Sequence, residues 1–195
     1  MKPILFIDFD GTLCHDRFWR SLPKEEYEKT RELLFSDDKT YVREWMKGKH
    51  TAEEVNEKLA EHLGIPFEVL WNVFVQDAKT MRVSKEVLEA IGRLRSRYTT
   101  VLLTVNMDSF SRFTVPALGL DGYFDAISNS YYEGKFKVDN GGEIFREYLD
   151  RFSAPLATSV LIDDSLDACE TFRSLGGIAH PVTPEKDLAY YVQKL

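Results

Sequence analysis

The sequence contains little cysteine, no long apolar run and no excess of positive charge. Its 195 residues include 2 cysteines, too few for a disulfide framework, and no metal-ligand spacing links them. No apolar stretch approaches the length of a membrane-spanning helix. The net charge of −7, from 25 basic and 32 acidic residues, argues against nonspecific binding to nucleic acid or to an anionic membrane, because both require a basic surface.

The N-terminal residues do not have the pattern of a signal peptide. One lysine and a very short apolar run precede Asp8, whereas a signal peptide needs a longer apolar region. Hydrophobic residues make up 44% of the chain, enough to bury a core, and the length suits one domain or a core with a small inserted subdomain. We expect a cytoplasmic protein, monomeric or homodimeric, with no membrane partner.

The first dozen residues contain the strongest functional signal. Residues 4–7 form a continuous apolar run, which predicts a short strand buried on both faces. Asp8 and Asp10 follow it directly, and Gly11 and Thr12 allow a sharp turn. Buried carboxylates are costly unless they meet a cation or a proton, and open α/β sheets bind ligands at the carboxyl ends of their strands. We therefore place Asp8 and Asp10 in an active site.

Two carboxylates at this spacing suit phosphoryl transfer. One can attack an electrophilic phosphorus and form an acyl phosphate that water cleaves, while the other protonates the leaving oxygen and then accepts a proton from water. Negative charges facing an anionic phosphate also require a divalent cation, and oxygen ligands favour Mg²⁺. A solvated acidic turn or a calcium loop is the simpler alternative, but Leu13-Cys14-His15 supplies no further acidic ligand for such a loop.

A helical segment is predicted over residues 14–81. A capping box, a proline near a helix start and glycines at helix ends mark the boundaries within it. The predicted helices cover residues 21–35, 39–47, 51–63 and a stretch from Pro66. An insertion directly after the catalytic strand predicts a cap over the site, and a helical bundle with only a packing role is the alternative.

A second buried strand is predicted over residues 99–105, and its end also carries polar groups. The Thr104 hydroxyl and the Asn106 amide can hydrogen-bond phosphoryl oxygens. Asp108 is expected to cap the following helix, which runs through Leu118. These residues extend the predicted site to a second strand.

Two later segments supply a candidate lysine and further acids. A phosphoryl-transfer site needs a cation beside its nucleophile, and after a third predicted strand at residues 124–127 either Lys135 or Lys137 can provide it. A fourth buried strand then ends in acid, at Asp163 and Asp164, with Asp167 following. Helix capping is the alternative role for these acids.

The apolar strands and intervening helices predict an α/β fold. We expect a parallel, Rossmann-like sheet with helices on both faces and a small inserted α-helical cap domain. The predicted core comprises residues 1–13 and 82–195, and the predicted cap comprises residues 14–81. A strand over residues 178–182 and a helix starting near residue 183 complete the expected core.

Four segments together resemble the motifs of the haloacid dehalogenase superfamily, whose members are mostly phosphatases. Phe6-Ile-Asp-Phe-Asp-Gly-Thr12 resembles its first motif, the strand ending at Thr104 its second, residues 134–139 its third and residues 159–167 its fourth. The dehalogenases that named the superfamily lack the second aspartate, here Asp10. The chain therefore resembles the phosphatase branch with a helical cap after the first motif, similar to phosphoglycolate phosphatase and β-phosphoglucomutase.

The resemblance implies a role for each motif residue. Catalytic roles fall to Asp8 as nucleophile, Asp10 as general acid/base, Thr104, and Lys137, with Lys135 as its competitor. The implied ligands of Mg²⁺ are Asp8, Asp163, Asp164 and the backbone carbonyl of Asp10, and Asp167 competes with Asp164. Substrate contacts are expected from Gly11, Thr12, Arg17, Thr104, Val105 and Asn106.

The predicted function is that of an enzyme, a Mg²⁺-dependent phosphomonoester hydrolase. It would act on a small phosphorylated metabolite through an aspartyl-phosphate intermediate. A phosphomutase, which returns the phosphate to its substrate, and a nucleotidase are the enzymatic alternatives. A catalytically silent regulatory protein would instead bind a phosphometabolite without Mg²⁺-dependent turnover.

Overall fold

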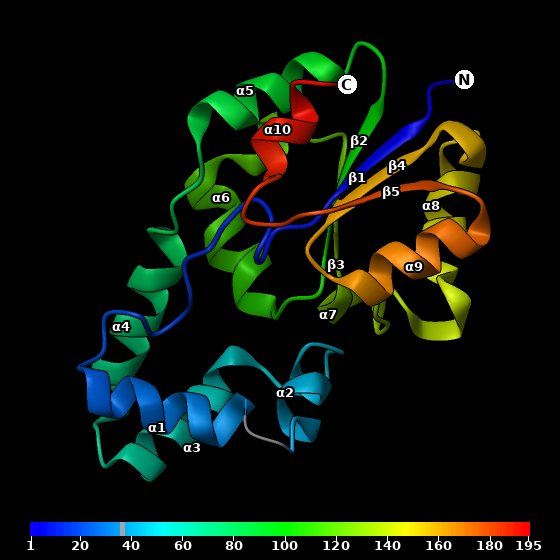
Figure 1. The fold of residues 1–195 in the computed structure, drawn as a ribbon. Helices are drawn as coiled ribbons and strands as arrows, with labels where there is room; N and C mark the ends of the chain where they lie inside the picture. Colours follow the sequence, from blue (N-terminus) through cyan, green and yellow to red (C-terminus); the bar gives the residue numbers. More distant parts are fainter. Residues whose placement is uncertain (36–37) are drawn as a thin grey trace.

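A parallel sheet forms the centre of the chain in a computed structural model that describes residues 1–35 and 38–195 (Figure 1). Its strands, all parallel, lie side by side in the order β3-β2-β1-β4-β5. They are β1 (Ile4–Ile7), β2 (Thr99–Thr104), β3 (Ala126–Asn129), β4 (Val160–Asp163) and β5 (Ile178–Pro181). The central position of β1 brings its carboxyl end next to those of β2 and β4.

Alternate residues of the central strands point to opposite faces of the sheet. Leu5, Ile7 and Leu102 belong to one apolar cluster, which α5, α6 and α10 cover (Figure 1). Ile4 and Phe6 belong to a second cluster on the other face, where α8 and α9 lie. Both faces are therefore buried, which explains the continuous apolar runs of the strands and confirms the predicted α/β fold.

The helices occupy the segments between the strands and the insertion after β1. They are α1 (Lys24–Phe35), α2 (Thr40–Trp45), α3 (Ala52–Leu63), α4 (Phe67–Lys79), α5 (Lys85–Leu94), α6 (Val115–Leu118), α7 (Ser130–Glu133), α8 (Glu143–Arg151), α9 (Leu166–Leu175) and α10 (Leu188–Val192). A π-helical segment, Phe110–Thr114, precedes α6. Within the described ranges, no helix is both long and apolar enough to cross a membrane.

The helical group α1–α4 lies beyond the carboxyl ends of the strands (Figure 1). The apolar cluster on one face of the sheet continues into this group through Leu34, Trp45, Leu59 and Phe74. The group therefore packs against the core through a shared apolar interior. Its predicted identity as a separate cap domain over residues 14–81 stays a prediction.

The buried carboxylate of Asp108 joins the helical group to the core. It is 3% exposed and accepts hydrogen bonds from the Trp45 indole N–H at 2.8 Å, the Ala52 backbone N–H at 3.2 Å and the Arg112 guanidinium at 2.8 Å. Asp108 was expected to cap its own helix, but it lies within the first turn of that helix and bonds to the start of α3 instead. Local sequence could not indicate this, because Ala52 is 56 residues away.

The third strand and the last helix start later than predicted. β3 begins at Ala126 rather than at residue 124, because the Asp125 carboxylate turns back to accept a hydrogen bond from the Thr100 backbone N–H at 2.9 Å. α10 begins at Leu188 rather than near residue 183, after a turn, with the Asp187 side chain as its N-cap. Both differences shift boundaries and leave the topology unchanged.

Replacing Asp108 with alanine is expected to destabilise the protein by about 3 kcal/mol, because the buried N–H groups of Trp45 and Ala52 lose their acceptor. Urea denaturation measures this loss. Asp121→Ala, at an exposed position, is the matched control and is expected to change stability by less than about 0.5 kcal/mol. Equal losses in the two variants would contradict the joining role of Asp108.

Candidate active site

A buried ammonium group lies between two aspartates from neighbouring strands. Asp8 follows β1 and Asp163 ends β4, and their exposed fractions are 4% and 1%. The Lys137 Nζ donates to the Asp8 carboxylate at 2.5 Å and to the Asp163 carboxylate at 2.6 Å. Lys135, the competing lysine, instead pairs with Glu147 on α8 at 2.6 Å. The structure therefore brings Lys137, and not Lys135, to the two aspartates.

Burial and charge act against each other in this group. Burial lowers the pKa of Lys137, but the Asp8 and Asp163 carboxylates outweigh it, so the pKa is raised and the ammonium stays charged. Burial raises the pKa of Asp8; Lys137 opposes this rise and the negative charge of Asp163 adds to it. One ammonium thus does not balance the negative charge of both carboxylates, and a further cation would reduce the remaining repulsion between them.

Three of the acids could hold that cation. Asp8, Asp163 and Asp164 can each place one carboxylate oxygen within 4.8 Å of the others. Oxygen ligands of this kind suit Mg²⁺, so the donor set fits the predicted metal. Asp167 lines the same pocket but is not among these three. The Asp10 carboxylate also lies outside the set, and its backbone carbonyl as a ligand stays a prediction.

Gly11 allows the turn after β1 to approach Asp164 closely. Its φ angle is +82°, and a Cβ at this position would lie 2.2 Å from Asp164 Oδ2. Any side chain would displace one of the candidate metal ligands. The neighbouring Thr12 is 4% exposed, and its hydroxyl has no hydrogen-bond partner among residues 1–35 and 38–195. The predicted substrate contacts of Gly11 and Thr12 stay predictions.

Asp10 faces groups from two other parts of the chain. Its carboxylate accepts a hydrogen bond from the Asn106 side chain at 2.6 Å, and the Arg17 guanidinium lies 3.8 Å away. The buried Thr104 hydroxyl lies 3.5 Å from the Asn106 amide nitrogen. Burial raises the pKa of Asp10 to about 6, although Arg17 opposes the rise. A carboxyl group with this pKa can both donate and accept a proton near neutral pH.

The candidate catalytic pocket, at the carboxyl ends of the strands, includes an arginine that the sequence did not indicate. Asp8, Asp10 and Val105 line this cavity of about 310 Å³ together with Arg43, which lies on α2 of the helical group. The Arg43 guanidinium stacks 4.6 Å from the centre of the Phe136 ring. The helical group therefore contributes a positive charge to a pocket whose acids come from the sheet.

Contacts between distant segments position Arg43. The Lys47 ammonium pairs with Asp139 at 2.6 Å, across 92 positions of the sequence. The Ser130 hydroxyl donates to the Met46 backbone carbonyl at 2.7 Å. These contacts hold the end of α2 against the segment that carries Lys137. No local pattern marks Arg43, because its place depends on this docking.

Residues 3–176 match the model of the haloacid dehalogenase-like hydrolase family. The chain belongs to this family. Comparison with curated proteins found no match. The family assignment agrees with the four motifs, whose residues meet at one edge of the sheet.

Several solved structures share the fold of this haloacid dehalogenase-like hydrolase. An enzyme of the family from Bacteroides thetaiotaomicron, in complex with magnesium and inorganic phosphate, has a TM-score of 0.74 and 20% identity over 98% of this chain and 99% of its own. A predicted family hydrolase from Porphyromonas gingivalis has a TM-score of 0.74 and 20% identity, over 100% and 97%. A 2-haloacid dehalogenase from Pseudomonas syringae has a TM-score of 0.65 and 19% identity, over 95% and 88%. At these identities the likeness establishes the fold alone.

Replacing Asp10 with asparagine is expected to stabilise the metal-free hydrolase increasingly as pH rises. The folded-state pKa of about 6 exceeds the ordinary 3.8, so between these values the folded protein holds a proton that the unfolded chain has lost. The native chain therefore loses stability as pH rises through this range, and the variant avoids that loss. After allowance for the partial exposure of Asp10, the stability of the variant relative to the native chain is about 1 kcal/mol greater at pH 7 than at pH 4.

Urea denaturation in the presence of a chelator, at both pH values, measures this difference. Asp121→Asn, at an exposed position, provides the control and should show no such trend. If the free energy of unfolding of Asp10→Asn relative to that of the native chain stays constant or falls as pH rises, the pKa of Asp10 is not raised.

Proposed function

We propose that this family member is a Mg²⁺-dependent phosphomonoester hydrolase, acting on a small phosphorylated metabolite through an aspartyl-phosphate intermediate. The observation that carries the proposal is the buried Lys137 between Asp8 and Asp163, with Asp10 beside them. An ammonium at this point favours the ionised, nucleophilic form of Asp8 and offsets charge on an incoming phosphate. We also propose that the protein is cytoplasmic and is either a monomer or a homodimer.

The residues divide the reaction into two steps. An Asp8 oxygen attacks phosphorus, and the bond from phosphorus to the leaving oxygen breaks as Asp10 gives that oxygen a proton. Asp10 then takes a proton from water, whose oxygen attacks phosphorus and breaks the bond to Asp8, releasing inorganic phosphate. Thr104 and Asn106 can hydrogen-bond the phosphoryl oxygens during both steps.

The acids at the sheet edge would hold the metal. Asp8, Asp163 and Asp164 are the proposed carboxylate ligands, and the Asp10 backbone carbonyl is a further one. When bound, Mg²⁺ supplies positive charge that stabilises phosphoryl oxygens. The Bacteroides thetaiotaomicron enzyme of the same fold, in complex with magnesium and inorganic phosphate, supports this choice of metal and ligand.

Dehalogenation is a second candidate, since a 2-haloacid dehalogenase shares the fold. Asp10 argues against it, because hydrolysis of a carbon–halogen bond needs no acid to protonate an alkoxide leaving group. A phosphomutase, a nucleotidase and a silent phosphate-binding protein use the same phosphate site. Product analysis separates the mutase and the silent protein from the proposed hydrolase, and the preferred substrate identifies a nucleotidase.

Asp8→Asn is expected to lower kcat/KM by about 10³-fold or more, because an amide oxygen is a poor nucleophile. The measurement is phosphate release from a panel of small phosphomonoesters, with Mg²⁺ or with a chelator. Release by the native chain should require Mg²⁺. Full activity of Asp8→Asn, or chloride release from 2-chloropropionate without phosphate release from any ester, would overturn the proposal.

A matched pair of variants tests the metal ligands in the same assay. Asp164→Asn should raise the Mg²⁺ concentration for half-maximal activity by about tenfold or more, while Asp167→Asn should leave it nearly unchanged. The reverse order would assign the ligand role to Asp167. Isomerised rather than hydrolysed sugar phosphates would identify a mutase.

A further inference from the structure

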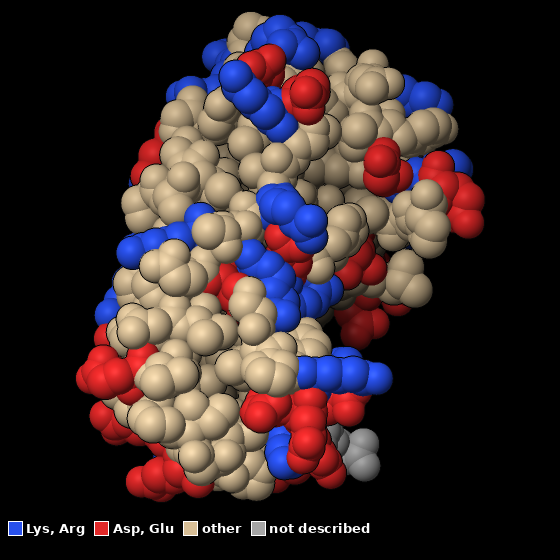
Figure 2. Space-filling view, turned by 90° about the vertical axis from the view of Figure 1, so that its left-hand side faces the viewer, with Lys and Arg blue, Asp and Glu red and all other residues tan. Residues whose placement is uncertain are grey.

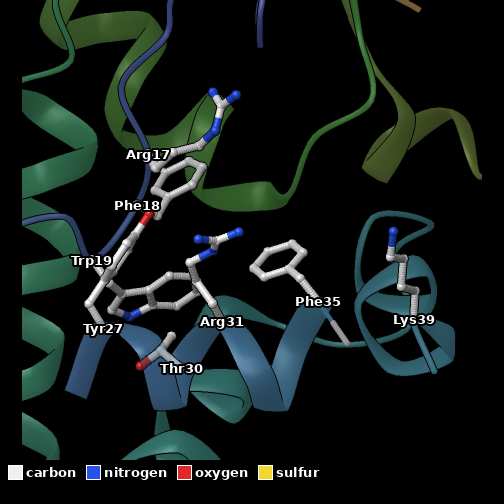
Figure 3. Close-up of a pocket in the computed structure, with 8 residues that line it drawn as sticks. All are labelled: Arg17, Phe18, Trp19, Tyr27, Thr30, Arg31, Phe35 and Lys39. Carbon is white, nitrogen blue, oxygen red and sulfur yellow. The ribbon is translucent and has the colours of Figure 1, made fainter. Parts of the chain in front are cut away.

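A second pocket, of about 490 Å³, lies between α1 and the core (Figure 3). Arg17 lines it, and the Arg17 guanidinium also lies 3.8 Å from the Asp10 carboxylate of the catalytic pocket. Asp10 is the residue that would protonate the leaving oxygen. Arg17 thus contacts both pockets, which makes the second pocket the candidate site for the group attached to that oxygen.

The lining of the second pocket is positively charged. Arg17 comes from the loop after β1, Arg31 from α1 and Lys39 from the residue before α2. Their side chains are directed toward the space between α1 and the core (Figure 3). None of the described lining residues is acidic, although the chain has a net charge of −7. Figure 2 shows Lys and Arg side chains across the middle of the molecule, with Asp and Glu side chains among them.

Arg17 pairs with Asp10, but the other two positive charges of this lining have no ion-pair partner among the described residues. In residues 1–35 and 38–195, neither Arg31 nor Lys39 forms an ion pair within 4.0 Å, and the same holds for Arg43 in the adjoining catalytic pocket. Lys137 and the proposed metal already offset the negative charge of the phosphoryl group. Arg31 and Lys39 are thus available for a second negative charge.

Four aromatic rings and Thr30 form the rest of the described pocket wall. Phe18 and Trp19 are buried at its base, and Tyr27 and Phe35 stand at its side. Trp19 has a φ angle of +58°, a left-handed conformation that tryptophan seldom adopts, and its indole N–H donates to the buried Asn56 at 2.9 Å. This hydrogen bond holds the ring in place. The pocket therefore offers a fixed apolar surface below its cationic rim.

We infer that the second pocket binds the leaving group of the substrate, and that this group carries a second anion. The inference rests on the proposed phosphomonoester hydrolysis. Arg31 and Lys39 bind the second anion, a carboxylate or a second phosphate, while the aromatic wall contacts the apolar part of the leaving group. The substrate class is thus a phosphomonoester with an anionic group on its leaving side.

Matched esters test this inference. The probes are 4-carboxyphenyl phosphate and its methyl ester, 4-(methoxycarbonyl)phenyl phosphate, which differ in the charge of one substituent. The native chain should prefer the charged probe by about tenfold or more in kcat/KM. The double variant Arg31→Met/Lys39→Met should bring this preference close to one. Lys24→Met, an exposed position on α1 outside the pocket lining, should retain the native preference.

A third probe, 1,4-phenylene bisphosphate, separates the two sources of the anion. A higher kcat/KM for this probe than for 4-carboxyphenyl phosphate, after correction for its two equivalent esters, assigns the pocket to a second phosphate. The opposite order assigns it to a carboxylate. Either preference must disappear in Arg31→Met/Lys39→Met for the inference to stand.

A binding measurement separates this inference from the proposed function. Calorimetry with the Mg²⁺-loaded native chain compares 4-carboxybenzylphosphonate with its methyl ester, and neither ligand needs turnover. If the chain prefers the charged phosphonate but hydrolyses no ester, the result supports the anion pocket and rejects the proposed hydrolase activity. Equal hydrolysis of both phenyl esters, equal affinities of both phosphonates, or no phosphonate binding overturns the anion pocket and leaves the proposed hydrolase to its own test.

Discussion

The ion pairs that Lys137 makes with Asp8 and Asp163 are the interaction on which the site depends. Buried charges of like sign repel each other, and the ammonium between these two aspartates offsets part of that cost. The fold places them together because β1 and β4 are parallel neighbours whose carboxyl ends meet. The Asp8 backbone N–H extends this pairing by donating to the Ile162 carbonyl at 3.0 Å. The register of the strands and the chemistry of the site are therefore coupled.

The helical group adds residues beyond the acids at the sheet edge. Its docking depends on polar contacts at the core surface, including those of Asp108 and Asp139, and on the shared apolar cluster. The same docking brings Arg43 to the catalytic pocket and opens the space beside Arg31 and Lys39. In the proposed function, the sheet edge would bind the phosphoryl group, and the helices would bind the group attached to it.

The sequence predicted the features that depend on neighbouring residues. Buried parallel strands are continuous apolar runs, so β1, β2 and β4 were recognisable along with the polar residues at their ends. The helix α8 was not predicted, although Ile144, Phe145, Tyr148 and Leu149 have helical spacing, because no apolar run draws attention to it. No local sequence pattern indicates that Arg43 lines the pocket.

Ambiguities between nearby residues had a similar cause. Lys135 and Lys137 lie in one short loop, and only the path of that loop decides which reaches β1 and which reaches α8. Asp164 and Asp167 both follow β4, but the turn after the strand directs only Asp164 toward Asp8 and Gly11. The sequence shows the order of such residues along the chain, whereas the distances of their side chains from Asp8 depend on the folded structure.

The most direct test of the central claim is chemical trapping of the proposed acyl phosphate. Borohydride added during turnover reduces an acyl phosphate to an alcohol, and peptide mass spectrometry then locates the modified residue. A nucleophilic role for Asp8 predicts homoserine in its place, formed only when Mg²⁺ and a hydrolysable ester are both present. Unmodified Asp8 during continued turnover, with the reduced residue at another position, would contradict it.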